Sequence, residues 1–329
     1  MLDELYVLDG NFKKIAVVDT YLSILWARRY QSEGEFELVV PADLAGDLVI
    51  GRFVGRGDDD GLMIIEQVKY DSDEDMGDRC TVTGRSWEAL MVRRVIPYAT
   101  TVYGTAEMAI RRLFAENMGE DAAVSRQMVF VSPYMTGYST KVRLDFQGES
   151  LLDAVKKIAS AGECGFRFVK SAGQYVLDVY EGTDNYNVIF SVDLDNVSRS
   201  TYTDNAQPYR NGCWVYSDNS SASYGFGILL VGTATGMELR ETFAKADANI
   251  SNSEMTLVGN NTLASAARVK DCDMDLVPVY TYGADYELGD KIMLKNEYGF
   301  QGYGRIAEVI EYVDEAGYRC IPSVTKISS

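Results

Sequence analysis

Histidine is absent from all 329 residues of the chain. Because histidine is the commonest general base and a frequent metal ligand, its absence removes the usual catalytic triads and most zinc signatures. Carboxylate chemistry remains open, but among 49 acidic residues some pairs must lie at hydrolase-like distances by chance. No local motif selects one such pair, so a hydrolase is kept only as an alternative.

Cysteine is rare and scattered. The five cysteines are Cys80, Cys164, Cys213, Cys272 and Cys320. They are odd in number, far apart and never arranged as CxxC, so neither a disulfide framework nor a zinc site is expected. Small, unpaired thiols in a reducing compartment fit this pattern better.

Long apolar runs are also missing. The opening residues, MLDELYVLDG, are acidic and contain no apolar signal core. The most compact apolar stretch, Phe226–Val231, is far too short to span a bilayer. We therefore expect a protein made in the cytoplasm, with no stable membrane insertion.

Positive charge is in short supply. The chain has 31 basic against 49 acidic residues, a net charge of -18. Nucleic-acid binding needs cations that displace counterions from phosphate, so sequence-specific binding of DNA or RNA is not expected. Three consecutive acids, Asp58, Asp59 and Asp60, form a short negative stretch in the first region.

What the sequence has in abundance is alternation of apolar and polar residues at both ends. In Lys291–Lys295 and again in residues 304–310, apolar side chains fall at every second position. This predicts two strands, and the closing YRCIPSVTKI completes a three-stranded meander. Near the start, LYVLDGNFKKIAVVD predicts a hairpin that turns at Asp9-Gly10 with positive φ angles.

The middle of the chain, residues 98–185, has helical spacing instead. TAEMAIRRLFAENMG predicts a helix capped by Thr105, and ESLLDAVKKIASAGECG predicts a second. The strands GFRFVK and QYVLDVYEG follow, so this region is expected to be a small α+β domain. Further on, residues 236–275 are a possible insert, with a short helix predicted at residues 262–270.

Two short motifs imitate ligand sites but fail on spacing. Asp71, Asp73 and Asp75 occupy the first positions of a calcium loop, yet Met76 stands where the loop needs glycine. GYGRIA imitates a dinucleotide fingerprint but lies between strands rather than at the start of a helix. No cofactor, metal site or catalytic residue is therefore predicted.

Five segments carry a family resemblance through their order and spacing along the chain. They are WARRYQSEGEFELVVPA, TVTGRSWEALMVRRVI, GESLLDAVKKIASAGECGFRF, VYEGTD and YELGDKIMLKNEYG. Together they resemble the siphovirus-type phage tail hub family. That family is related to the N-terminal hub part of tail-associated lysins and to the baseplate hubs of contractile tails.

The resemblance implies an α+β, mainly β fold. Two tube-like antiparallel β-barrel domains, residues 1–97 and 186–329, would flank the α+β domain of residues 98–185. Three chains would form a ring in which the two barrels alternate as a pseudo-hexamer, capping the tail tube at the virion tail tip. Some relatives carry a C-terminal peptidoglycan-cleaving domain, which is not expected here because the chain ends at Ser329.

The expected partners are a homotrimer's other copies and further tail proteins: a distal tail protein or tube ring, a tape measure, and a tail spike or fibre. DNA would pass only as cargo, and Asp58, Asp59 and Asp60 would form a channel-facing acidic loop. The protein would be synthesised in the bacterial host cytoplasm and would not be an enzyme. A peptidoglycan hydrolase of the tail tip and a receptor-binding module remain as alternatives.

Overall fold

The computed structural model describes residues 4–72, 77–132, 137, 140–171, 173–220, 223–277, 279–298 and 301–326. Within these residues the protein is mainly β with few helices, as the sequence predicts. Asp73, Asp75 and Met76 of the calcium-like loop lie outside the described residues. Cys80, Cys164, Cys213 and Cys320 are free thiols, and the side chain of Cys272 lies outside the described part.

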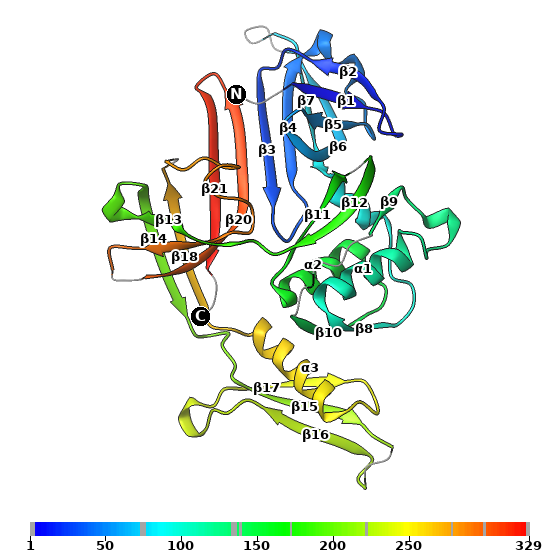
Figure 1. Cartoon of the computed structure of the whole chain (residues 1–329), viewed down its shortest axis with the longest axis vertical. Coiled ribbons are helices and arrows are strands. Elements are labelled where there is room, and N and C mark those ends of the chain that lie inside the picture. Colours follow the sequence, from blue (N-terminus) through cyan, green and yellow to red (C-terminus); the bar gives the residue numbers. More distant parts are fainter. Residues whose placement is uncertain are drawn as a thin grey trace.

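One large sheet of eleven strands joins the two ends of the chain (Figure 1). In spatial order, the first five strands are β13 (Asp184–Ser191), β19 (Lys291–Lys295), β20 (Gln301–Asp314), β3 (Ser23–Arg29) and β4 (Glu35–Pro41). The order continues with β7 (Arg79–Ser86), β6 (Asp59–Asp71), β5 (Phe53–Arg56), β1 (Leu5–Leu8) and β2 (Lys14–Val18). β21 (Gly317–Lys326) pairs with β20 outside this path.

Strand β20 holds the sheet together because it has three partners. Its first residues, 301–305, pair with β19, and residues 308–313 pair with β3. Along residues 304–314 it also pairs with β21, so the predicted meander β19-β20-β21 is confirmed. Two strands far apart in the sequence, β3 and β20, thus share one hydrogen-bonded ladder.

The expectation of two separate β-barrels is wrong for the described residues. The sheets are not closed: the large sheet runs as an open path from β13 to β2, and each of these end strands pairs on one side only. Strands from the regions 1–97 and 186–329 lie in the same sheet instead of in two. The β20–β3 pairing, which no local pattern encodes, is the physical reason.

The predicted α+β region contains both expected helices. α1 (Ala106–Asn117) begins at Thr105, whose side chain accepts the Met108 N–H, and α2 (Leu151–Gly162) is capped in the same way by Ser150. The strands form two small sheets. They are β8 (Thr100–Thr105) with β10 (Lys141–Phe146), and β11 (Gly165–Ser171) with β12 (Gln174–Tyr180) and β9 (Phe130–Val131).

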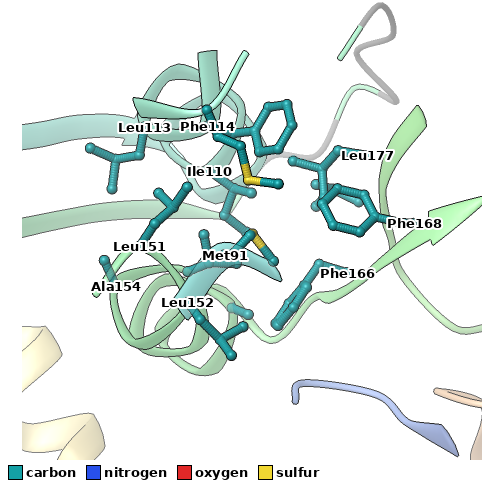
Figure 2. Packing of buried hydrophobic residues seen from close by; sticks show 14 of the residues in the cluster. Met91, Ile110, Leu113, Phe114, Leu151, Leu152, Ala154, Phe166, Phe168 and Leu177 are labelled. Carbon is teal, nitrogen blue, oxygen red and sulfur yellow. The ribbon is translucent and has the colours of Figure 1, made fainter. Parts of the chain in front are cut away.

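The two helices and β11 enclose the largest apolar core (Figure 2). Ile110 and Phe114 of α1 meet Leu152 of α2 and the phenyl rings of Phe166 and Phe168. Trp87 and Met91 of the preceding segment are buried in the same cluster. That segment is a 3₁₀ helix, η2 (Trp87–Arg93). The shared core fixes the α+β region on the first β region.

A small separate unit lies at the far end of the molecule, between paired strands β14 (Val197–Asn205) and β18 (Val269–Leu276) (Figure 1). Its sheet runs in the order β16 (Phe226–Val231), β15 (Gly212–Asp218), β17 (Glu241–Ala246). α3 (Asn252–Ser265) covers one face of it. The helix predicted at residues 262–270 is therefore misplaced, since most of those residues follow α3 and lead into β18.

The remaining short elements are 3₁₀ helices: η1 (Ala42–Asp47), η3 (Val124–Arg126), η4 (Val192–Leu194) and η5 (Gly236–Glu238). The hairpin β1–β2 is confirmed, but its positive φ falls on Phe12 rather than on Asp9-Gly10. Asp9 shapes the turn differently, because its carboxylate accepts the N–H groups of Asn11 and Lys13. Among the described residues, no helix has the length and apolar character needed to cross a membrane.

Candidate functional site

The acidic stretch Asp58, Asp59 and Asp60 lies at the tight turn from β5 to β6. Asp58 and Asp60 are exposed, whereas Asp59 is half-buried. Asp59 Oδ2 accepts hydrogen bonds from the Arg28 guanidinium, 2.6 Å from Nη2, and from Trp26 Nε1 at 3.1 Å. The three predicted residues therefore differ: two are held by arginines, and only Asp60 forms no ion pair with a described residue.

These aspartates belong to a buried ionic cluster that the sequence does not reveal. Arg56 is almost fully buried and binds Asp58 Oδ2 at 2.7 Å and Glu311 Oε2 at 2.9 Å. Glu311, on β20, is also paired with Arg28. The Tyr318 hydroxyl of β21 donates to Glu311 Oε1 at 2.9 Å. Two arginines and three carboxylates thus join the β5–β6 turn to the C-terminal meander.

The arginines control the ionisation of this cluster. Burial would raise the pKa of Glu311, but the hydrogen bond from Arg56 and the charge of Arg28 outweigh burial and lower that pKa. Burial likewise opposes ionisation of Asp58, and the bonds from Arg56 again lower its pKa. Glu311 and Asp58 therefore stay ionised at neutral pH, and the paired arginines largely neutralise their negative charge.

A cleft of about 380 Å³ opens beside the cluster. It lies between the first β strands, β11 and the loop before β19, and Asp59, Glu88 and Tyr282 are among its lining residues. Glu88 is buried, and burial raises its pKa to about 7. Its Oε1 accepts the Phe168 N–H at 2.6 Å, while Trp87 Nε1 donates to the Phe168 carbonyl at 3.1 Å.

A carboxyl group that titrates near neutral pH is suited in principle to acid–base catalysis. Here, however, Glu88 and Trp87 form hydrogen bonds with the N–H and carbonyl groups of Phe168 on the edge of β11 that has no neighbouring strand. The nearest acidic candidate, Asp59, is held by Arg28 and Trp26. The arrangement is that of a structural joint between elements. Among the described residues, no group of three His, Cys, Asp or Glu side chains is placed to hold a metal ion.

Sequence reasoning found the aspartates but missed their partners Arg28, Arg56 and Glu311, and the buried Glu88. No local signal could have identified Glu311 as the partner of Arg28, because the two residues are 283 positions apart.

The sequence profile of the family described as Siphovirus ReqiPepy6 Gp37-like protein matches residues 4–324. The chain belongs to this family. The match spans nearly all of the sequence, and it agrees with the siphovirus-type family that the five segments resemble. No curated protein sequence matches the chain.

Solved structures of tail proteins have a similar fold. The 43 kDa tail protein of prophage MuSo2 from Shewanella oneidensis has a TM-score of 0.62 at 13% identity, covering 98% of each chain. The tail protein from Neisseria meningitidis MC58 has a TM-score of 0.61 at 13% identity, covering 98% of this chain and 96% of its own. Prophage tail protein gp18 from Listeria monocytogenes EGD-e reaches 0.59 at 12%, covering 99% and 96%. At such low identity the similarity concerns the fold.

Proposed function

We propose that the chain is a structural hub protein of a phage or prophage tail tip, that three copies form a ring capping the tail tube, and that DNA passes through it. The family match over residues 4–324 carries this proposal. It is supported by the fold, which resembles tail proteins along almost their whole length. It is also consistent with carboxylates that are held in structural contacts rather than presented to a substrate.

The partners would be the two other copies, a distal tail protein or tube ring, a tape measure, and a spike or fibre. Asp60 is the best remaining candidate for an acidic residue that faces the channel, because it is exposed while Asp59 is bound to Arg28. An acidic channel wall offers phosphate no cation, so DNA would slide past it.

The mass of the assembly that the purified chain forms in solution tests the proposed ring. Mass photometry is expected to find three chains, and negative-stain microscopy is expected to show rings with a central opening. A protein that stays monomeric at all accessible concentrations would contradict the proposal.

The alternative of a peptidoglycan hydrolase rests on Glu88, a buried carboxyl group of the cleft whose pKa is raised to about 7. Incubation with purified peptidoglycan is expected to release no soluble fragments. Release that disappears in Glu88→Gln would establish the hydrolase instead. Binding of the isolated chain to host cells would favour the receptor-binding alternative.

A further inference from the structure

The outer face of the β16-β15-β17 sheet exposes a group of apolar side chains that no other described element covers. α3 packs on the inner face, where Cys213, Val215 and Val231 are buried. Side chains of the opposite parity point outward, and the register places Leu230 and Phe243 on either side of Trp214. We call this surface the aromatic face. It consists of Trp214, Phe226, Ile228, Leu230 and Phe243, all of them exposed.

The size of the aromatic face matches what an interface requires. Its five side chains are 36% to 60% exposed. At roughly 150–250 Å² for a large side chain, they present on the order of 400 Å² of apolar surface. A standard interface buries about 800 Å² per partner, of which about 450–520 Å² is apolar. A patch of this size on a monomer commonly marks an interaction site.

The aromatic face is also held rigidly on the rest of the molecule. Arg143 of β10 is buried, and its guanidinium binds Asp247 at 3.0 Å and Glu254 at 3.2 Å. Its backbone carbonyl accepts Asn261 Nδ2 of α3 at 2.7 Å. Because the small unit is fixed in this way, little ordering entropy has to be lost when a partner binds.

A second surface collects positive charge in this acidic protein. We call it the arginine patch, and it consists of Arg93, Arg94, Arg126, Val95 and Val124. Arg94 Nε donates to the Arg126 carbonyl at 2.8 Å, and Arg126 Nη2 donates to the Val95 carbonyl at 2.7 Å. Val95 and Val124 are exposed beside them.

The arginines of this patch lack the usual counter-charge. The side chains of Arg94 and Arg126 bond to carbonyl groups and to the Asn117 side chain. None of the three arginines forms an ion pair with a carboxylate in the part of the chain that the structure describes. Burial and the charges of Arg126 and Arg93 lower the pKa of Arg94. In a protein with 49 acidic residues, such a gathering of unneutralised arginines is suited to an acidic partner.

The aromatic face carries the matching negative charge at its border. Asp218 and Glu241 are exposed at the ends of β15 and β17, on the same side of the sheet as Trp214 and Phe243. Lys245 lies on this side too and pairs with Asp218 at 3.5 Å, so one negative charge remains in excess there. Arginine stacks well on aromatic rings and pairs with carboxylates, and aromatic and arginine side chains dominate binding energy at interfaces. One copy of the chain therefore offers both halves of a complementary contact.

We propose that the aromatic face of one copy docks on the arginine patch of a second copy. Two chains of charge -18 repel each other, and this contact brings an apolar surface with two carboxylates and one lysine against three arginines that have no carboxylate partner among the described residues. A contact between two different surfaces repeats from copy to copy, and it closes into a ring when the rotation allows. The inference deepens the proposed hub function and rests on it.

Charge reversal of both surfaces tests the contact in the full chain. Self-association is measured by sedimentation at low and high salt. The double variant Arg93→Glu with Arg126→Glu is expected to weaken self-association by at least about tenfold. Adding Asp218→Arg and Glu241→Arg to this variant is expected to restore self-association to within about threefold of the wild type. The matched control is Arg112→Glu with Arg167→Glu, since these exposed arginines already pair with Glu116 and Asp178. That control is expected to associate as the wild type does.

An apolar pair of variants tests the other half. Ile228→Ser with Phe243→Ser is expected to weaken association by about tenfold or more. Ile15→Ser with Val17→Ser, at similarly exposed positions of β2, is expected to leave it unchanged. Melting curves establish that each variant folds. If the arginine double variant fails to fold, Asp218→Arg with Glu241→Arg alone must weaken association in its place.

Several results would overturn the contact. The first is that the wild-type chain never self-associates. The second is that both sets of variants leave self-association unchanged. The third is that the wild-type chain binds a short labelled DNA duplex and the arginine variants do not. Trimers that ignore the variants would refute the contact and leave the proposed ring intact. Open-ended oligomers that need both surfaces would keep the contact and refute the trimeric ring.

Discussion

Glu88 shows at the scale of one residue how burial changes chemistry. Its pKa is raised to about 7 by burial, from an ordinary value of 4.5. Between these two pH values the unfolded chain has released the proton and the folded chain still holds it. The free energy of unfolding therefore decreases as the pH rises from 4.5 to 7, by up to about 3 kcal/mol.

Glu88→Gln is expected to remove this pH dependence, because the amide oxygen can still accept the Phe168 N–H but carries no titrating proton. Urea unfolding at several pH values across this window measures the slope. Glu116→Gln, on the exposed side of α1, is the control and should keep the wild-type slope. Parallel slopes for Glu88→Gln and wild type would mean that another group titrates.

Glu311 has the opposite behaviour, because the arginines lower its pKa. Its contribution to the free energy of unfolding is present at neutral pH, and it is lost as the pH falls below the ordinary pKa range of a glutamate. Glu311→Gln leaves Arg56 with Asp58 and Arg28 with Asp59, so we expect a loss of about 2–3 kcal/mol at neutral pH, below the usual cost of an orphaned buried charge.

The control for this change lies on the same strand. Glu308 pairs with Arg29 near the surface, and Glu308→Gln is expected to cost about 1 kcal/mol or less. Chemical denaturation at neutral pH measures both variants. Equal losses of unfolding free energy would show that the buried ionic cluster stabilises the protein no more than the Arg29–Glu308 pair does.

At the scale of elements, Gly259 lies in the middle of α3, where glycine costs about 1 kcal/mol relative to alanine. Its position is explained by packing: an added Cβ would lie 2.5 Å from Val231 Cγ2 and 3.1 Å from Val215 Cγ2. Gly259→Val is therefore expected to push α3 off the sheet and to destabilise the small unit by about 1–3 kcal/mol.

Asn260→Val, at the neighbouring exposed position, introduces the same side chain without this clash. It is expected to cost well under 1 kcal/mol. Hydrogen exchange of the β15 amides compares the two variants. Similar exchange rates in the two variants would contradict the close packing of α3 on the sheet at Gly259.

Helices α1 and α2 were predictable because one apolar side and a capping residue coincide in each. α3 was not found by periodicity, since few of its side chains are buried. The signal that identifies it is the capping box, in which Ser251 and Glu254 bond to each other's backbone N–H groups. The position of the hairpin turn was also predicted wrongly, because side-chain hydrogen bonds and not the Asp9-Gly10 pair determine its shape. The Asp9 carboxylate binds two backbone N–H groups of the turn, and the residue with positive φ is Phe12.

At the scale of the whole molecule, Arg143 links the small unit to the α+β region. Arg143→Met removes both ion pairs while keeping the apolar stem. We expect the amides of β15–β17 to exchange faster by about tenfold, because the unit can open locally while the large sheet stays closed. Arg167→Met, at a surface pair, should change no exchange rate in β15–β17. Equal protection in both variants would contradict the role of Arg143.

The sequence predicted the mainly β character, the meander and the α+β middle, because these depend on local periodicity. It did not predict the single open sheet, the ionic cluster or the cleft. Each of these depends on β20 reaching β3 and on Glu311 reaching Arg56, and alternation alone does not specify which strand is the neighbour.

The β20–β3 ladder has a consequence for how the protein is made. Arg29 pairs with Glu308, 279 residues later in the chain. At a synthesis rate of about 5–20 residues per second, the edge of β3 waits roughly 14–56 seconds for its partner. Throughout that interval the nascent chain presents an open strand edge that a neighbouring chain could occupy. Crowded ribosomes on one message would place such edges side by side, so slower initiation should favour soluble protein.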